Sequence, residues 1–327
     1  MQDLVTVFGG SGFVGSQVVR ALARAGYRVR VAVRQPARAH DLLLLGDVGQ
    51  IQVVQANIRN AASVARALDG AQVCVNLVGV LYESGRQKFM TLHTMGARHV
   101  AQAAREAGVR RMVQISAIGA DPDGASKYAR TKAEGEAAVR EILPDAVILR
   151  PSIVFGPEDD FFNRFAAMAV LSPALPLIGG GKTRFQPVYV GDVARAVAAA
   201  VADPHAAGKT YELGGPAVLT FRQILEMVLS QTQRRRFLVP LPFPVARMIG
   251  KVCGLLAMTP IAPPLTVDQV EQLRVDNVAD PALPGLEALG VRPTAVESVL
   301  GTYLYRYRKG GQFAEAPEAP AIGVNPA

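Results

Sequence analysis

Short apolar runs alternate along this chain with longer segments whose apolar residues recur at helical spacing. We predict strands at residues 4–8, 28–33, 51–54, 73–77, 112–115 and 147–149, and helices at 14–25, 88–107 and from 128 onward. A helix thus follows the first, the fourth and the fifth of these strands. This order is typical of an α/β protein with a doubly wound parallel sheet, in which helices cover both faces.

The first predicted strand leads directly into a glycine-rich turn at 9–15, and then into a helix that ends near Gly26. Gly10, Gly12 and Gly15 fit the pattern G-x-G-x-x-G of dinucleotide-binding turns. Glycine lets backbone N–H groups approach a pyrophosphate, which the positive end of the helix attracts. We therefore predict a Rossmann-type dinucleotide-binding domain. The turn residues expected at the cofactor are Gly9, Ser11, Gly12, Phe13, Val14 and Gly15.

Residues at the ends of the next strands are expected to line the same site. Arg34 ends the second strand and Arg38 follows four residues later, where guanidinium groups suit a ribose 2′-phosphate. This pair favours NADP(H) over NAD(H), although two solvated loop arginines would give the same pattern. Later strand ends add Asn57 and Ile58 beside the adenine, and Leu77, Val78 and Gly79 along the cofactor.

A candidate catalytic group follows the fifth strand. Ser116 lies at the end of that strand, and Tyr128 and Lys132 lie at positions i and i+4 of the next helix, on one helix face. We expect the ammonium of Lys132 to lower the pKa of the Tyr128 phenol. Ser116 would polarise a carbonyl, Tyr128 would exchange the proton, and Lys132 would also hold the nicotinamide ribose. Many surface helices contain the same pair, so the glycine turn upstream is what makes it informative.

Composition narrows the class of protein. Half of the 327 residues are hydrophobic, but no run reaches the roughly 18 to 20 uninterrupted apolar residues of a membrane span. The net charge of +8 comes from scattered basic residues, which favours an anionic cofactor or membrane surface over nucleic acid. Cys74 and Cys253 are predicted to be reduced thiols, and the first strand leaves no room for a signal peptide, so we expect a cytoplasmic protein. No metal-ligand cluster is evident.

Longer motifs resemble a known family. The glycine turn, Arg34, Ser116 and the Tyr128/Lys132 pair are similar to extended short-chain dehydrogenases/reductases of the epimerase/dehydratase type. The stretches 115–121, 149–165 and 185–194 more closely resemble the NADPH-binding accessory subunits of respiratory complex I and their bacterial relatives. The resemblance covers about residues 3–305.

This resemblance implies an NADP(H)-binding subunit that associates with complex I subunits, peripherally on the cytoplasmic side of the inner membrane. It also implies that Pro151 and Ile153 lie at the nicotinamide end of the cofactor. The cofactor would then be structural. His93 occupies a place where many epimerase relatives carry asparagine, and this departure argues against substrate turnover. Fold alone does not decide the function, so a second hypothesis stays open. Under it, the chain is an active NADPH-dependent reductase or epimerase acting on a small carbonyl or sugar-nucleotide substrate.

The chain is predicted to divide into a Rossmann domain at 1–157, a smaller α/β lobe at 158–308 and a disordered tail at 309–327. Elements of the lobe are expected to interleave partly with the first domain. To the lobe we assign a helix at 191–202, a strand at 211–213, a helix at 221–231 capped by Thr220, and a last helix at 295–307.

Residues 244–258 form a predicted amphipathic helix with a basic polar face. Its apolar side includes Met248, Ile249 and Val252, and Arg247 and Lys251 lie opposite. Packing against its own lobe is the default expectation for such a helix. Docking on an anionic membrane surface or a hydrophobic partner is the alternative.

Overall fold

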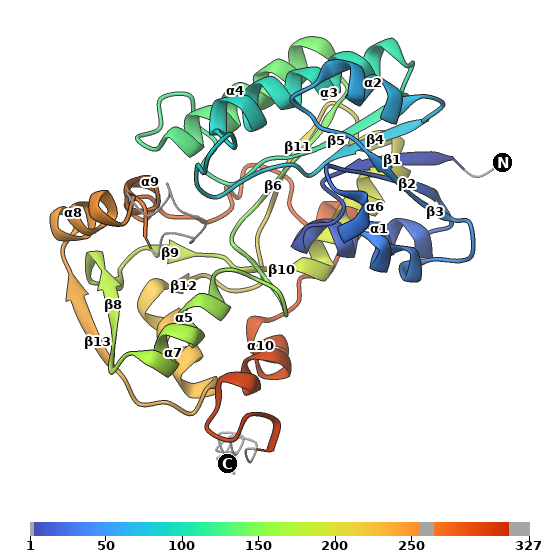
Figure 1. The fold of residues 1–327 in the computed structure, drawn as a ribbon. Helices are drawn as coiled ribbons and strands as arrows, with labels where there is room; N and C mark the ends of the chain where they lie inside the picture. The colour runs from blue at the N-terminus through green and yellow to red at the C-terminus, as the bar shows by residue number, and fades with distance from the viewer. Residues whose placement is uncertain (1–2, 255–264, 314–327) are drawn as a thin grey trace, which may run out of the picture.

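A computed structural model describes residues 3–254 and 265–313 (Figure 1). Its centre is a seven-stranded sheet in the order β11-β6-β5-β4-β1-β2-β3, and every pairing in it is parallel. The strands are β1 (Leu4–Phe8), β2 (Arg28–Val33), β3 (Ile51–Gln55), β4 (Val73–Asn76), β5 (Arg111–Ile115), β6 (Val147–Pro151) and β11 (Thr210–Leu213). This confirms the predicted Rossmann-type α/β class.

Helices cover both faces of the sheet (Figure 1). One face carries α1 (Phe13–Arg24) and α6 (Val190–Ala202), and the other carries α2 (Ala61–Leu68), α3 (Met95–Glu106) and α4 (Lys127–Ile142). Alternate strand residues enter the two cores: Val5 and Val7 of β1 face α1 and α6, while Phe8 packs on the opposite side. Burial on both faces explains the nearly continuous apolar runs of these strands.

The helix predicted at 88–107 is one continuous segment with two geometries. Met90–Thr94 forms a π-helical turn, and α3 continues from Met95. A π-turn inserts an extra residue into the helix and often marks a functional site. Here it turns His93 into the interior, where only 3% of the residue is exposed.

Two segments assigned to the smaller lobe belong to the Rossmann sheet instead, so that expectation was wrong. The strand at 211–213 is β11, which pairs with β6 at the edge of the seven-stranded sheet. The helix at 191–202 is α6, whose Val193 and Val197 are fully buried in the same core as α1. The chain therefore leaves the sheet after β6 and returns to complete it.

The smaller lobe is built on an aromatic core between short sheets. Its helices are α5 (Phe162–Leu171), α7 (Phe221–Gln231), α8 (Phe243–Gly254), α9 (Val267–Gln272) and α10 (Val296–Leu304). Its strands pair as β7 (Val154–Phe155) with β10 (Val188–Tyr189), β8 (Ala174–Ile178) with β13 (Phe237–Leu241), and β9 (Arg184–Phe185) with β12 (Leu219–Thr220). Thr220 caps α7 in a reciprocal box with Gln223, as predicted.

Asp159 holds the start of α5 against α10 in the smaller lobe. Its carboxylate accepts hydrogen bonds from the backbone N–H groups of Gly156, Phe162 and Asn163, and from the Tyr303 hydroxyl at 2.6 Å. Burial raises the pKa of Asp159 against these donors. The stretch 149–165 thus contains a structural carboxylate that joins α5 to α10. Of the predicted tail, residues 314–327 lie outside the described part of the chain.

Candidate functional site

The glycine turn has the geometry that a phosphate-binding turn requires. Gly9 has φ +80°, and Gly12 precedes α1 as its N-cap. A Cβ on Gly15 would lie 2.2 Å from the carbonyl oxygen of Gly9, so only glycine allows this contact between strand and helix. No side chain caps the start of α1, which leaves its first backbone N–H groups available to an anion.

The loop after β4 lies against Lys132 of α4. A Cβ on Gly79 would lie 3.2 Å from Lys132 Nζ and 3.7 Å from His93 Nε2. The N–H of Val80 donates to His93 Nε2 at 3.1 Å. A neutral imidazole that accepts at Nε2 carries its proton on Nδ1, which then donates to Thr131 Oγ1 at 3.2 Å. His93 therefore fixes the loop after β4 to α4.

His93 is a site residue that we did not predict, because a lone histidine gave no signal of burial. Burial, together with the nearby ammonium of Lys132, lowers the pKa of His93 well below its ordinary value and keeps the ring neutral. Its ring stacks on Phe89 at 5.2 Å and meets Tyr128 edge-on at 5.4 Å between centroids. The only hint in the sequence was its place where relatives carry asparagine.

Tyr128 and Lys132 come together as predicted, but their electrostatics differ from the expectation. Lys132 Nζ lies 5.7 Å from the centroid of the Tyr128 ring. Burial and the charge of Asp268 raise the pKa of Tyr128 above its ordinary value, so the predicted lowering is wrong. Burial also lowers the pKa of Lys132, to about 8, against the opposing charge of Glu136. Desolvation thus outweighs the attraction that the i, i+4 spacing suggested.

Ser116 follows the carboxyl end of β5, where Lys132 Nζ donates to the carbonyl of the preceding Ile115 at 3.5 Å. The backbone N–H of Ser116 donates to the Leu149 carbonyl at 2.8 Å, which fixes the residue next to β6. Its side-chain Oγ is buried and has no hydrogen-bond partner among the described residues. A buried hydroxyl without a partner costs about 1–3 kcal/mol, so a polar ligand atom at this position would be stabilising.

The predicted cofactor residues at the outer strands lie at the same carboxyl edge. Arg34 and Arg38 are both exposed, and neither guanidinium group makes a hydrogen bond or ion pair with any residue that the structure describes. Asn57 is half-buried, whereas Ile58 is buried, with its side chain against Gly96. Of the two residues predicted beside the adenine, only Asn57 is therefore partly exposed.

The loop after β6 is held by a residue from the far end of the chain. The Ser152 hydroxyl donates to Asn277 Oδ1 at 2.6 Å, and the N–H of Ile153 donates to the same oxygen at 3.1 Å. Asn277 Nδ2 donates in turn to the Ile118 carbonyl at 3.3 Å. We did not predict Asn277, since its partners lie more than a hundred residues away. Asn277 thus holds the chain directly after Pro151, the last residue of β6, and fixes the backbone of Ile153.

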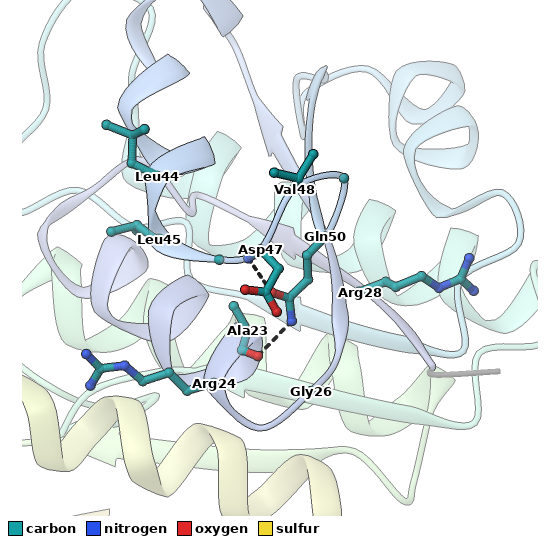
Figure 2. A pocket seen from close by; sticks show the side chains of 11 residues that line it. Ala23, Arg24, Gly26, Arg28, Leu44, Leu45, Asp47, Val48 and Gln50 are labelled. Atoms are coloured by element: carbon teal, nitrogen blue, oxygen red, sulfur yellow. Dashed lines mark hydrogen bonds between the residues drawn. The ribbon is translucent and has the colours of Figure 1, made fainter.

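A separate groove of about 630 Å³ lies at the opposite edge of the sheet (Figure 2). It is lined by the end of α1 and by residues just before β2 and β3, including Ala23, Asp47 and Gln50. Gln50 Nε2 donates to the Ala23 carbonyl at 2.7 Å, and its Oε1 accepts from the N–H of Asp47 at 2.8 Å. None of the predicted site residues lines this groove.

Comparison with known proteins identifies the class. A family model described as "NAD dependent epimerase/dehydratase family" matches residues 5–214. The fold is similar to DesIV, a dTDP-glucose 4,6-dehydratase from Streptomyces venezuelae solved with NAD and TYD bound, with a TM-score of 0.71 and 22% identity over 94% of this chain and 98% of that one. These matches agree with the parallel sheet and the glycine turn.

Two curated relatives narrow the assignment. The mitochondrial NADH dehydrogenase [ubiquinone] 1 alpha subcomplex subunit 9 of Mus musculus is 38% identical over 309 residues, which are 93% of this chain and 80% of that protein. The ceramide reductase of Caulobacter vibrioides is 33% identical over 196 residues, which are 59% of each protein. The chain belongs to the NAD dependent epimerase/dehydratase family and, within it, to the family of the alpha subcomplex subunit 9 proteins.

Proposed function

We propose that this protein is an NADP(H)-binding accessory subunit of respiratory complex I in which the cofactor is structural. The observation that carries the proposal is the 38% identity to the mouse subunit over 93% of this chain. That similarity spans the smaller lobe as well as the Rossmann domain. A likeness confined to the cofactor domain would instead support only nucleotide binding.

The proposed cofactor is NADP(H) rather than NAD(H). Arg34 and Arg38 offer two exposed guanidinium groups at the end of β2, where the family's fold places the adenosine ribose. Arginine binds phosphate through paired N–H groups, whereas a carboxylate at this position would repel it. The uncapped start of α1 would receive the pyrophosphate, and Ser116, Tyr128 and Lys132 would contact the nicotinamide half.

A structural role for the cofactor agrees with the electrostatics of Tyr128. A phenol whose pKa is raised by burial and by Asp268 is a poor base near neutral pH. Its hydroxyl remains protonated and able to donate a hydrogen bond to a bound ribose. The side chain therefore suits binding better than proton abstraction.

The proposed docking surface is the outer face of α8. Val245, Met248, Ile249 and Val252 are exposed, Met248 by 62% and Val252 by 65%. Only Ala246 and Gly250 of this helix are buried. The default expectation of packing against the lobe therefore does not account for the apolar face. Leu255 and Leu256, which belong to the same predicted helix, lie outside the described residues.

We propose that this α8 face contacts complex I where it meets the anionic membrane surface, on the cytoplasmic side of the inner membrane. Arg247 and Lys251 are exposed beside the apolar side chains. An apolar face flanked by basic residues suits the boundary between lipid headgroups and acyl chains. No helix in the described ranges is long and apolar enough to cross a membrane.

An active reductase or epimerase is the second candidate. Tyr128 lies beside Lys132, and Lys132 Nζ donates to the carbonyl of Ile115, which precedes Ser116, at 3.5 Å. The match to the ceramide reductase covers 59% of this chain. This candidate predicts NADPH oxidation with a small carbonyl or sugar-nucleotide substrate. The reaction would be lost in Tyr128→Phe, which removes the only hydroxyl of that side chain.

Purification of the native protein from membranes tests the two candidates against each other. The accessory-subunit proposal expects co-migration with NADH:quinone oxidoreductase activity and bound NADP(H) in the purified fraction. Substrate-dependent NADPH oxidation by a protein that never associates with the respiratory chain would overturn it.

A further inference from the structure

Residues 266–277, here called the return segment, run from the smaller lobe back to the carboxyl edge of the Rossmann sheet. The segment begins with α9, which starts at a reciprocal cap between Thr266 and Gln269. It ends at Asn277, which holds the loops after β5 and β6. In Figure 1, α9 lies beside α8 and below the start of α4. The segment thus contacts both the proposed docking helix and the proposed cofactor site.

Asp268 joins the return segment to α4. Its Oδ1 accepts the backbone N–H of Lys127 at 2.6 Å, and its Oδ2 accepts that of Tyr128 at 3.3 Å. These are the first two residues of α4, whose next free N–H group, that of Ala129, is capped by Ser126 at 3.0 Å. A carboxylate at the positive end of a helix is stabilised by the helix dipole. The backbone of Tyr128 is therefore positioned by the smaller lobe.

The other side of α9 is packed closely against α8. A Cβ on Gly250 would lie 2.9 Å from the backbone nitrogen of Val267, so the two backbones meet with no side chain between them. Arg247 of α8 forms an ion pair with Glu271 of α9 at 3.5 Å. A shift of α8 must therefore move α9, because a close backbone contact transmits displacement rather than absorbing it.

We infer that Asp268 is a positioning residue through which occupation of the cofactor site and the placement of α8 are coupled. The inference rests on the proposed function, since it takes NADP(H) as the ligand that Tyr128 and Lys132 hold. Coupling of this kind is reciprocal: a cofactor that fixes α4 also fixes α9 and α8, and a partner that fixes α8 strengthens cofactor binding. The subunit would dock best when loaded with cofactor.

Calorimetry and hydrogen exchange on the full chain test this coupling. Asp268→Asn keeps the shape of the side chain but removes its charge and one acceptor, and we expect NADPH binding to weaken roughly 5- to 20-fold, within the usual range for coupled sites. In the natural protein, NADPH should slow amide exchange in α8. In Asp268→Asn, saturating NADPH should leave the exchange of α8 unchanged.

Glu297→Gln is the matched control. Glu297 is an exposed carboxylate in the first turn of α10, so the variant also removes one acidic group from a helix start in the same lobe. It should retain both the NADPH affinity and the α8 response. Wild-type NADPH affinity in Asp268→Asn would overturn the inference, as would an α8 that ignores NADPH in the natural protein. Failure of the natural protein to bind NADPH at all would overturn the proposed function itself, a result that calorimetry distinguishes from the other two.

Discussion

Desolvation dominates the chemistry of individual residues at this site. Lys132 and Tyr128 are close enough to interact, yet burial raises the pKa of Tyr128 and lowers that of Lys132. Both shifts favour the neutral form of the side chain. Spacing along a helix predicts which side chains meet, but it says nothing about the depth at which they meet. The approach of Lys132 was therefore predictable from the sequence and its electrostatic effect was not.

The charge of Arg34 is expected to set the choice of cofactor. Arg34→Asp replaces a phosphate-binding group with a carboxylate, which accepts a ribose hydroxyl and repels a 2′-phosphate. NADPH affinity should fall at least tenfold, equivalent to about 1.4 kcal/mol, and the ratio of NADPH to NADH affinity should fall with it. Calorimetry with both cofactors checks this. Equal affinity of the natural protein for the two would contradict the assignment to NADP(H).

Lys132 is expected to destabilise the cofactor-free protein below its folded-state pKa. That pKa is about 8, below the ordinary value of 10.5, so the unfolded chain binds the proton more tightly. The destabilisation is complete below about pH 8 and is relieved as the pH rises toward 10.5, since stability increases wherever the unfolded state holds more protons.

Replacement of the charge tests this linkage. Lys132→Met should raise the unfolding free energy at pH 7 by an amount on the order of 3 kcal/mol, with a smaller gain at pH 10. Urea unfolding of both proteins at the two pH values measures the difference. A gain that does not depend on pH would mean that improved packing, rather than the lost charge, is responsible.

At the scale of elements, hydrophobic spacing predicted the strands and helices well and their grouping less well. Each sheet strand from β1 to β6 was predicted because strands buried on both faces are strongly apolar. The place of β11 was not, since a short strand carries no sign of which neighbour it will pair with. The π-turn at Met90–Thr94 was equally hidden, because it leaves the apolar pattern of the helix almost unchanged.

The site was predictable only where its residues carry a local signal in the sequence. The glycine turn, Ser116 and the Tyr128/Lys132 pair carry local signals, each a residue type at a fixed spacing after a strand. Asp268 and Asn277 carry none, because they act on backbone groups more than a hundred residues away. Only the fold brings the return segment to the sheet edge.

Substitutions at two glycines of the first turn are expected to have different effects, one on cofactor binding and the other on stability. A Cβ on Gly12 would come no closer than 3.5 Å to the carbonyl oxygen of Gly9, so Gly12→Val should fold and only obstruct the pyrophosphate. A Cβ on Gly15 would overlap that oxygen at 2.2 Å, so Gly15→Ala should lower the melting temperature without any ligand.

Thermal unfolding with and without NADPH separates these effects. When only the native state binds a ligand, a ligand concentration one hundred times the dissociation constant raises the free energy of unfolding by about 2.7 kcal/mol. The natural protein should therefore melt at a higher temperature with NADPH, while Gly12→Val should melt near the ligand-free temperature in either case. A normal NADPH response in Gly12→Val would place the cofactor elsewhere.

At the scale of the whole molecule, the two lobes divide the proposed roles. The Rossmann sheet presents the cofactor residues at its carboxyl edge, and the smaller lobe presents the α8 face on its own exterior (Figure 1). The return segment contacts both lobes, so a change at the cofactor site can reach α8 through direct contacts. The contacts between α8 and α9 described above are made at Gly250 and Arg247, so substitution of the exposed apolar side chains of α8 should disrupt docking and leave these contacts in place.

The α8 face should be required for membrane association but not for cofactor binding. Met248, Ile249 and Val252 are exposed by 62%, 38% and 65%, so polar replacements should cost the isolated protein little. Burying these side chains against lipid or a partner contributes about 25 cal/mol per Å² of apolar area, and serine or glutamine forfeits that gain. Fractionation should find the triple variant released from the membranes, with NADPH affinity in calorimetry within twofold of the natural protein.

Leu44→Gln with Val48→Gln is the control, since these side chains are 84% and 107% exposed beside the groove at the opposite sheet edge. Release of the control as well would show that any loss of exposed apolar surface suffices, whereas retention of the triple variant would exclude α8 as the docking helix.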